Sequence, residues 1–413
     1  MAMGDDDGDG NGDERGKFLT ENADVWSQNA WDHVPPPADQ RAIIAASLAR
    51  QRAAPVPDHD KPNYNTKPAK HWDNFYKTNA SNFFKNRKWL PLEFSELVAA
   101  ADLSAGHRTV VEVGCGAGNA IFPLLAQNQN PELHIHVFDY SSHAIKLVQN
   151  NPLYTSPPCG TIAASVWDLS SACPPPSLAP RSADILLLVF VFSALHPSEW
   201  PRAISNIAQI LKPGGLVLMR DFGRHDLTQL RLKAGRLLED NFYIRGDSTR
   251  VYFFELDELA ILFTGSTAPI AQVDVQVNES TKVDEEGKND GGDDGGGTGR
   301  DDEVETEDVG AQDERADIHG LMPSLDQNPA SPDNSYDPVP RPDPSSSSSL
   351  SSSSTNVIHP SLEDPTTLGL AHPLFTIEQL GVDRRLLVNR KRQLKMHRVW
   401  VQGKFRRAEG GGG

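Results

Sequence analysis

Apolar runs alternate with polar, glycine-containing segments through the middle of the chain and predict a series of strands. The runs lie at residues 110–113, 134–139, 162–168, 184–192 and 211–221. The fourth run is apolar throughout, which is typical of a strand buried on both faces of a sheet. The fifth begins with a helix end and the turn Pro213-Gly214-Gly215. The pattern therefore predicts an α/β fold with a mostly parallel sheet.

Apolar alternation returns near the C-terminus. Residues 380–389 and 397–402 predict two strands, which the basic residues 390–395 join into a hairpin. Parallel α/β sheets often carry an antiparallel edge strand, so we expect this hairpin to complete a seven-stranded sheet. Helices are expected at 39–52, with Asp39 as the cap, and at 255–263.

Most of the acidic charge lies outside these elements. The 413 residues carry a net charge of −17, but residues 1–16 contain six acidic residues and one basic residue, and residues 266–356 contain 21 and five. The rest of the chain is mildly basic. Such acidic, polar segments cannot bury a core and are expected to be disordered. The expected divisions are a tail 1–16, a basic and aromatic extension 17–90, a core 91–265, an insert 266–356, a hairpin segment 357–407 and a glycine tail 408–413.

The cysteines and the N-terminus restrict the class of protein. Three cysteines at irregular spacing predict neither a disulfide framework nor a metal site. The N-terminus has no basic region followed by an apolar one, as a secretory signal would. The longest apolar run is far shorter than the roughly 20 residues that cross a bilayer. We expect a soluble, cytoplasmic protein with no membrane contact.

The first strand leads into a glycine-rich loop that predicts a nucleoside cofactor. Gly114, Gly116 and Gly118 lack a Cβ atom, so a ligand can lie against the backbone beside a helix start. The spacing differs from the Gly-x-Gly-x-x-Gly pattern of dinucleotide sites. Glu112 would repel a pyrophosphate but would suit the ammonium group of S-adenosylmethionine, which we therefore favour over a nicotinamide cofactor.

Carboxylates at the ends of the following strands support this interpretation. Asp139 falls 21 residues after Gly118, near the spacing at which an acid meets ribose hydroxyls. Asp168 ends the third strand. Successive strand ends line one edge of a parallel sheet, where open α/β folds bind ligands. The sequence thus predicts a Rossmann-like fold that binds S-adenosylmethionine.

Two basic segments flank the predicted core. Residues 61–90 contain seven Lys or Arg and one acidic residue, interleaved with aromatic residues, and residues 371–407 contain ten and two. Bases stack on aromatic rings and phosphates pair with cations, so this mixture suits RNA. The alternative is a helix that docks its aromatics on the sheet and leaves its lysines in solvent. Trp72 and Tyr76 lie on one helix face, as either interpretation requires.

Several motifs resemble the eukaryotic tRNA N3-methylcytidine methyltransferases, which modify cytidine 32 of the anticodon loop. The similar motifs are His71-Trp-Asp-Asn-Phe-Tyr-Lys77, Asn82-Phe-Phe-Lys-Asn-Arg-Lys-Trp-Leu90, the loop 112–119, Phe222-Gly-Arg-His-Asp226, residues 242–254 and Val382-Asp-Arg-Arg-Leu-Leu-Val-Asn-Arg390. The segment Trp31-Asp-His-Val34 resembles the branch that acts on threonine tRNA, and serine tRNA is a second candidate. The resemblance implies a class I S-adenosylmethionine-dependent methyltransferase, and it is absent from residues 266–356.

The resemblance also implies roles for individual residues. Trp72 and Tyr76 would close over the cofactor, Gly114 would contact its methionine part and Asp139 its ribose. Asp168 and Val189 would lie at the adenine.

The substrate contacts are hypotheses from the residue types. Asp221 is the candidate for the exocyclic amine of cytosine, with Arg220 beside it as a second catalytic candidate. The candidate RNA contacts are Lys85, Arg87, Lys88, Arg245, Arg250, Arg390, Lys391 and Arg392. A small-molecule methyltransferase and a non-catalytic scaffold are the alternative functions. Whether an aminoacyl-tRNA synthetase or another protein presents the tRNA stays open.

Overall fold

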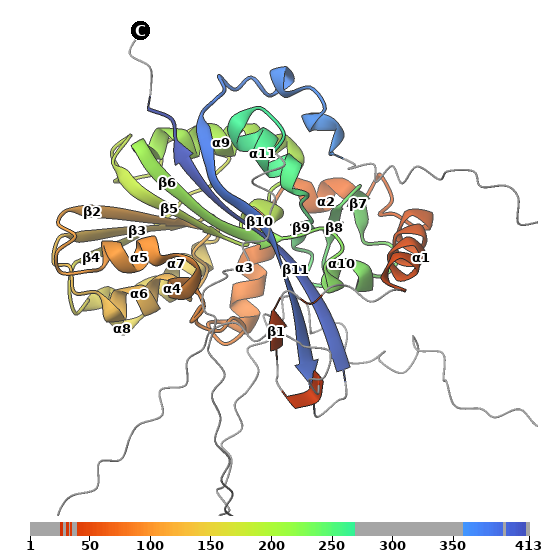
Figure 1. Cartoon of the computed structure of the whole chain (residues 1–413), viewed down its shortest axis with the longest axis horizontal. Coiled ribbons are helices and arrows are strands. Elements are labelled where there is room, and N and C mark those ends of the chain that lie inside the picture. Colours follow the sequence, from red (N-terminus) through yellow and green to blue (C-terminus); the bar gives the residue numbers. More distant parts are fainter. Residues whose placement is uncertain are drawn as a thin grey trace, which may run out of the picture.

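A single large sheet organises the molecule (Figure 1). The computed structural model describes residues 25–27, 30–32, 34, 39–268, 358–390 and 394–409. The acidic tail 1–16, residues 269–356 of the expected insert, and Lys391 and Arg392 lie outside the described residues. In the described part, eight strands form the sheet in the order β1-β10-β11-β6-β5-β2-β3-β4. Their bounds are β1 Ala30–Asp32, β10 Phe375–Asn389, β11 Leu394–Arg407, β6 Leu211–Phe222, β5 Ala183–Val189, β2 Arg108–Val113, β3 Leu133–Asp139 and β4 Thr161–Val166.

The sheet has the predicted parallel core and antiparallel closure. Strands β4, β3, β2, β5 and β6 are parallel neighbours, whereas β11 pairs antiparallel with β6 and with β10. These seven strands confirm the expected fold class. The short β1 adds an eighth strand on β10, where Trp31 packs in a small cluster with Leu386 and Val388.

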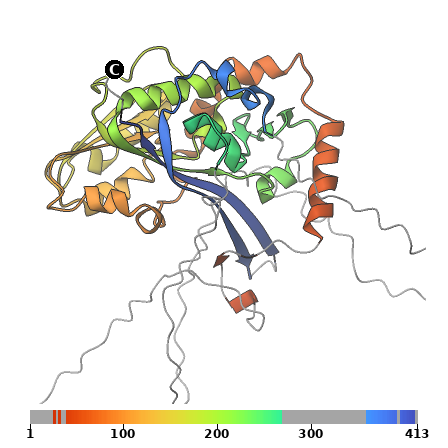
Figure 2. The same ribbon diagram turned by 45° about the horizontal axis from the view of Figure 1, so that its top comes forward.

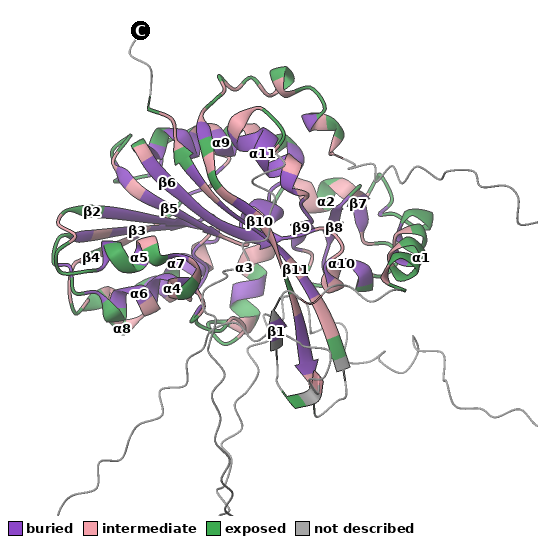
Figure 3. Ribbon diagram, in the orientation of Figure 1, coloured by how far each residue is buried: buried purple, intermediate pink, exposed green. Residues whose placement is uncertain are grey.

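Helices cover both faces of the sheet because alternate side chains of each strand point to opposite sides. On β5, Ile185 and Leu187 face one cluster, and Leu186 and Leu188 face the other. The first face is covered by α4 Leu90–Glu93, α5 Ser95–Ala100, α6 Ile121–Gln127, α7 Ser142–Gln149 and α8 Pro152–Thr155. The second is covered by α9 Trp200–Ile210 and α11 Leu256–Thr264. The central strands β2, β5 and β6 are mostly buried (Figure 3).

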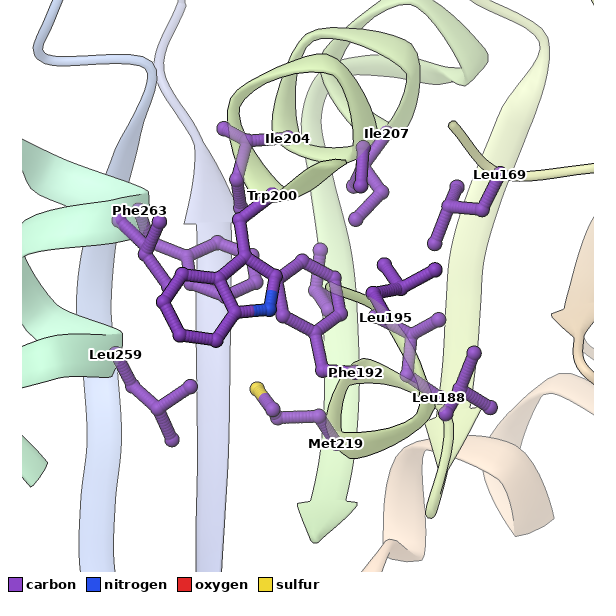
Figure 4. Packing of buried hydrophobic residues seen from close by; sticks show 14 of the residues in the cluster. Leu169, Leu188, Phe192, Leu195, Trp200, Ile204, Ile207, Met219, Leu259 and Phe263 are labelled. Atoms are coloured by element: carbon purple, nitrogen blue, oxygen red, sulfur yellow. The ribbon is translucent and has the colours of Figure 1, made fainter. Parts of the chain in front are cut away.

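The second face holds the larger apolar cluster, and Trp200 lies at its centre (Figure 4). Its indole is fully buried between α9 and α11, with Phe192, Ile204 and Phe263 around it. A tryptophan in such a position buries about 150–250 Å². This packing fixes the loop after β5, which contributes to the cavity described below.

Smaller elements surround one end of the sheet. They are α1 Gln40–Ala53, α2 Lys61–Asn65, α3 Pro68–Asn79, α10 Leu227–Arg231 and the three-stranded sheet of β7 Leu237–Glu239, β8 Phe242–Ile244 and β9 Arg250–Tyr252. Short 3-10 turns are η1 Val25–Ser27, η2 Phe192–Ala194, η3 Pro197–Glu199, η5 Pro360–Leu362 and η6 Pro365–Leu368. No helix among the described residues is long and apolar enough to cross a bilayer.

Three local predictions were wrong. Asp39 precedes α1 with helical backbone angles, and its side chain makes no capping hydrogen bond. The strand expected over 184–192 ends at Val189, because Phe190 has a φ of +58°. The Pro213-Gly214-Gly215 sequence lies within β6 rather than before it, and the register with β5 shifts there.

The C-terminal hairpin is longer than expected and projects from the domain (Figures 1 and 2). Strand β11 pairs with β6 over Trp400–Arg406, while β10 and β11 pair with each other from Phe375↔Arg407 to Asn389↔Leu394. The part of the hairpin on the turn side of Trp400 therefore extends past the end of β6. This projecting end carries Arg390.

The chain leaves the core and returns to it at the same helix. The backbone N–H of Ala268 donates to Oδ1 of Asp257 at 3.1 Å, and that of His359 donates to Oε1 of Glu258 at 2.9 Å. Both acceptors lie in the first turn of α11. The segment 269–357 is thus bounded on both sides by hydrogen bonds to neighbouring residues.

Candidate active site

A cavity opens at the carboxyl ends of β2, β3, β4 and β5. It contains about 900 Å³ of empty space, including the open solvent at its mouth. The structure brings seven of the eight predicted cofactor residues to its wall, from five parts of the chain. They are Trp72, Tyr76, Gly114, Gly116, Asp139, Asp168 and Val189.

The glycine loop makes close contact with the N-terminal extension. Gly116 has a φ of +53°, and a Cβ atom there would lie 2.4 Å from the hydroxyl oxygen of Tyr76. Only glycine allows this approach without displacing the tyrosine. Gly118, by contrast, does not line the cavity: its N–H donates to the carbonyl of Cys115 at 2.8 Å, and a Cβ would collide with the ring of Phe122. Its observed contacts close the turn of the loop.

Asp139 lies at the centre of the cavity wall. Its Oδ2 accepts a hydrogen bond from the N–H of Gly116 at 2.9 Å, and its Oδ1 accepts one from the N–H of Ser141 at 2.8 Å. Burial raises its pKa to about 6, while these two bonds counteract the rise. Asp139 is therefore ionised at neutral pH and held in a fixed orientation.

Two buried polar atoms of the cavity lack a partner within the described part of the chain. They are Oε2 of Glu112 and the hydroxyl of Tyr140. Burial raises the pKa of Glu112 to about 8, although the guanidinium of Arg87 lowers it. An unsatisfied buried polar group costs free energy, so both atoms suit a polar, cationic ligand. S-adenosylmethionine, with its hydroxyls, ammonium and sulfonium, fits this donor and acceptor set.

Helix α3 covers the cavity with aromatic rings. The rings of Trp72 and Tyr76 stack at 5.9 Å between centroids, and both side chains line the cavity. The chain after α3 is held against the glycine loop by Asn119. The side-chain amide of Asn119 donates to the backbone carbonyl of Phe84 at 3.0 Å. The backbone carbonyl of Asn119 accepts from the backbone N–H of Arg87 at 2.9 Å. The extension thus forms one wall of the site.

Two arginines assigned to RNA from the sequence line this cavity instead of the open surface. Arg87 is 9% exposed, with its guanidinium 5.6 Å from the ring centroid of Phe84 and 5.5 Å from that of Phe190. Arg245 is 7% exposed and lies 5.8 Å from the ring centroid of Trp72. Burial lowers the pKa of Arg245. Both cations therefore lie in the interior of the site and not on the open surface.

The two catalytic candidates do not line the cavity. Arg220 is clamped between the indoles of Trp89 and Trp400, 4.6 Å from each centroid, and pairs with Asp383. Asp221 is buried on the opposite face of β6, where its carboxylate accepts from the N–H of Ser193 at 3.0 Å. Adjacent strand residues point to opposite faces of the sheet, so Arg220 and Asp221 cannot share one site. Their position next to each other and their charges were therefore not enough to predict a contact with the substrate.

The remaining RNA candidates divide into buried and exposed residues. Arg250 is 1% exposed, pairs with Glu199 at 2.9 Å and donates to the carbonyl of Ala194. It is an internal ion pair and cannot reach a phosphate in this fold. Lys85, Lys88 and Arg390 are exposed. Lys391 and Arg392 lie outside the described residues.

Sequence reasoning missed several residues of the wall. Tyr140 directly follows Asp139, and Asn119 is the last residue of the loop 112–119, so their positions carried a usable signal. Phe190 carried none, because nothing in an apolar strand predicts that one residue takes a positive φ. Its N–H donates to the carbonyl of Arg220 at 2.8 Å, and such strained residues gather at functional sites. In the described part of the chain, no group of three His, Cys, Asp or Glu side chains could hold a metal ion.

Comparisons with known proteins agree with this geometry. A family model described as a methyltransferase domain matches residues 111–217. The tRNA N(3)-methylcytidine methyltransferase of Schizosaccharomyces pombe is 47% identical over 248 residues, which cover 60% of this chain and 79% of that protein. The tRNA(Thr) (cytosine(32)-N(3))-methyltransferase of Saccharomyces cerevisiae is also 47% identical over 248 residues, covering 60% and 39%. The tRNA N(3)-cytidine methyltransferase of Danio rerio is 37% identical over 281 residues, covering 60% and 78%.

The similarity and the site together establish the family. The chain spans most of the length of the Schizosaccharomyces pombe and Danio rerio relatives, and its cavity has the glycine loop and strand-end acids of an S-adenosylmethionine site. The chain belongs to the family of tRNA N(3)-methylcytidine methyltransferases, and its cofactor is S-adenosylmethionine.

Proposed function

We propose that this protein methylates N3 of cytidine 32 in the anticodon loop of threonine tRNA, with serine tRNA as a second substrate. The observation that carries the proposal is the composition of the cavity. The cavity is lined by the acids Glu112, Asp139 and Asp168 and also by Arg87 and Arg245, whose guanidinium groups lie against aromatic rings. A site that contains both kinds of group can hold a cationic methyl donor beside a planar, acceptor-bearing base.

The chemistry requires little proton transfer. Bound S-adenosylmethionine supplies an electrophilic methyl group, and N3 of neutral cytosine carries a lone pair. The protein therefore needs no strong general base, and orientation of the base is the main contribution. The N3 edge is also the pairing edge, so cytidine must be unpaired and turned into the cavity, as an anticodon loop allows.

The aromatic and guanidinium groups that line the cavity suit such a base. Rings of Trp72, Phe84 and Phe190 offer faces for stacking, which is worth about 1–3 kcal/mol per base. The guanidinium of Arg245 has only donors, and the O2 atom of cytosine and the neighbouring phosphates are acceptors. We assign to Arg245 the orientation of the flipped nucleotide, in place of the acidic group Asp221.

Exposed cations outside the mouth would hold the rest of the anticodon arm. Lys85 and Lys88 follow α3, and Arg390 lies at the projecting end of the hairpin. Phosphate contacts from such residues position an RNA without reading its sequence. A presenting protein, such as an aminoacyl-tRNA synthetase, would add the discrimination between tRNAs that these contacts lack.

The test is nucleoside mass spectrometry of threonine tRNA incubated with the protein and S-adenosylmethionine. We expect N3-methylcytidine in the wild-type tRNA and none when cytidine 32 is replaced by uridine. Arg245→Met should lower kcat/KM by about 100-fold, as loss of a charged hydrogen bond at the reacting base would. Arg245→Lys should recover only part of the rate, because a lysine lacks the planar fork.

Binding of S-adenosylmethionine by Arg245→Met should stay within about threefold of wild type. Addition of a cognate synthetase tests the presenting partner separately. A wild-type protein that methylates small molecules, but no tRNA with or without a synthetase, would contradict the proposed substrate.

A further inference from the structure

Asp73 links helix α3 to the core of the domain. Its Oδ1 accepts a hydrogen bond from the hydroxyl of Ser141 at 2.7 Å and another from the backbone N–H of His143 at 3.1 Å. The Nδ1 atom of His143 lies 3.3 Å from the same oxygen. Partial burial raises the pKa of Asp73, but the bonds from Ser141 and His143 outweigh it and lower the pKa overall. Asp73 is therefore a carboxylate at neutral pH.

Ser141 continues this link into the cofactor site. Its backbone N–H donates to Oδ1 of Asp139 at 2.8 Å, and Oδ2 of Asp139 accepts from Gly116. The hydroxyl of Ser141 also accepts from the N–H of Ala144 at 3.2 Å as the cap of α7. A short chain of hydrogen bonds thus runs from α3, through the start of α7, to the acid of the cavity.

Helix α3 meets the cavity at a second point. Tyr76 lies three residues after Asp73 and places its hydroxyl against Gly116. Trp72, which immediately precedes Asp73, stacks on Tyr76. The helix also packs on α7 through Phe75 and Ala144, but that contact is apolar and has little directional preference. The charged hydrogen bonds of Asp73 supply the direction that apolar packing lacks.

We propose that Asp73 is a positioning residue that keeps α3 closed over the cofactor, so that it sets the rate of cofactor release. Because Trp72 and Tyr76 form the cover, a bound molecule leaves when α3 moves away from the glycine loop. Breaking the bonds from Asp73 to Ser141 and His143 makes this movement easier. The inference rests on the cofactor part of the proposed function and is independent of which RNA is methylated.

The experiment measures dissociation of S-adenosylmethionine from the full-length protein by stopped-flow fluorescence of the site tryptophans. Asp73→Ala should release the cofactor about tenfold faster, the factor expected for losing a charge-assisted hydrogen bond. Asp73→Asn keeps an acceptor oxygen for Ser141 and His143, so release should be within about threefold of wild type. Asn74→Ala, an exposed change on the same helix, is the matched control and should release at the wild-type rate.

Steady-state kinetics separates positioning from general destabilisation. The KM for S-adenosylmethionine should rise in Asp73→Ala, while kcat and the KM for tRNA at saturating cofactor stay near wild type. Wild-type release from Asp73→Ala would overturn the proposal. So would an equal loss in Asp73→Ala and Asp73→Asn that also raises the KM for tRNA, since that result indicates a structural defect. Release is measured without RNA, so a wrong tRNA assignment would leave it unaffected.

Discussion

The backbone N–H of Gly116 donates a hydrogen bond of 2.9 Å to Oδ2 of Asp139. The bond joins the loop after β2 to the acid at the end of β3, so the two sides of the cofactor site are held together before any ligand arrives. Each carboxylate oxygen of Asp139 accepts one backbone N–H and retains a second lone pair. These lone pairs are suited to two neighbouring hydroxyl groups, as in a ribose.

Replacement of Asp139 by alanine should abolish measurable binding of S-adenosylmethionine. Two hydrogen bonds to a charged acceptor are worth about 1.5–3 kcal/mol each, so affinity should fall by about 100-fold or more. The sheet should persist in far-UV circular dichroism, although the N–H groups of Gly116 and Ser141 lose a partner. Calorimetric titration of the folded variant checks this, and wild-type affinity would show that the ribose is bound elsewhere.

The affinity for S-adenosylmethionine should depend on the protonation of Glu112. Burial raises its pKa to about 8 from an ordinary value of 4.5, so Glu112 is mostly neutral at pH 7 without ligand. A cationic ligand favours the ionised form, and affinity relative to Glu112→Gln should rise about tenfold between about pH 6.5 and about pH 8.5. The Gln variant is the control for titration of the ligand's own amine.

The same carboxyl group affects the stability of the ligand-free protein. Between the ordinary pKa and the raised one, the folded state binds more protons than the unfolded state. Stability therefore falls as pH rises through this window. The melting temperature of wild type should fall relative to that of Glu112→Gln as pH rises through this window.

The affinity measurement has its own contradicting outcome. If the ratio of S-adenosylmethionine affinities between wild type and Glu112→Gln does not change with pH, Glu112 is ionised throughout and does not meet the cation.

Removal of Arg220 should destabilise the fold without altering the cofactor site. Arg220→Met takes this partner from the partly buried carboxylate of Asp383, which keeps its ion pair with Arg385, and should cost about 1.5–3 kcal/mol of the free energy of unfolding. Arg406→Met is the matched control, because Arg406 pairs with Glu378 at a side-chain exposure of 44% and should cost less than about 1 kcal/mol. Denaturant unfolding gives both values. If the folded Arg220→Met variant binds the cofactor more weakly than wild type, Arg220 contributes to the active site and this prediction is wrong.

Binding of tRNA should lose salt dependence when exposed cations near the mouth and on the hairpin are neutralised. Changing Lys85, Lys88 and Arg390 to glutamine should reduce the slope of log affinity against log salt by about two to three. A triple change at Arg108, Lys146 and Arg202, which are exposed on other elements, should leave the slope nearly unchanged. Equal effects of the two triple variants would show that attraction is spread over the whole surface.

The sheet could be predicted from the sequence because its signals are local. Each of the five predicted parallel strands has an apolar run, and the hairpin has alternation on both sides of a basic turn, whereas the short β1 has no such signal. The glycine loop and Asp139 could also be predicted, since their function depends on backbone freedom and on the end of a strand. Sequence reasoning worked best for residues whose place follows from their position at the end of a strand.

The arginines could not be placed in this way. Arg87, Arg220 and Arg250 are alike in sequence, yet one lines the cavity, one lies between two indoles and one pairs with Glu199. Burial of a guanidinium depends on carboxylates and rings brought from distant segments, such as Asp383 for Arg220. Local sequence contains no record of these partners, so charge alone assigned Arg87 and Arg250 to RNA and Arg220 to catalysis.

The two hydrogen bonds at the start of α11 bear on whether the body and the hairpin must belong to one continuous chain. Since Asp257 and Glu258 hold the outgoing and returning chain side by side, placement of the hairpin does not depend on the covalent path between them. Strand β11 is bound to β6 along seven paired positions from Trp400 to Arg406, which is an interface of its own. The molecule is in effect two pieces that recognise each other, a body and a β-hairpin, and a chain cut between residues 268 and 358 retains every contact that the described residues make between them.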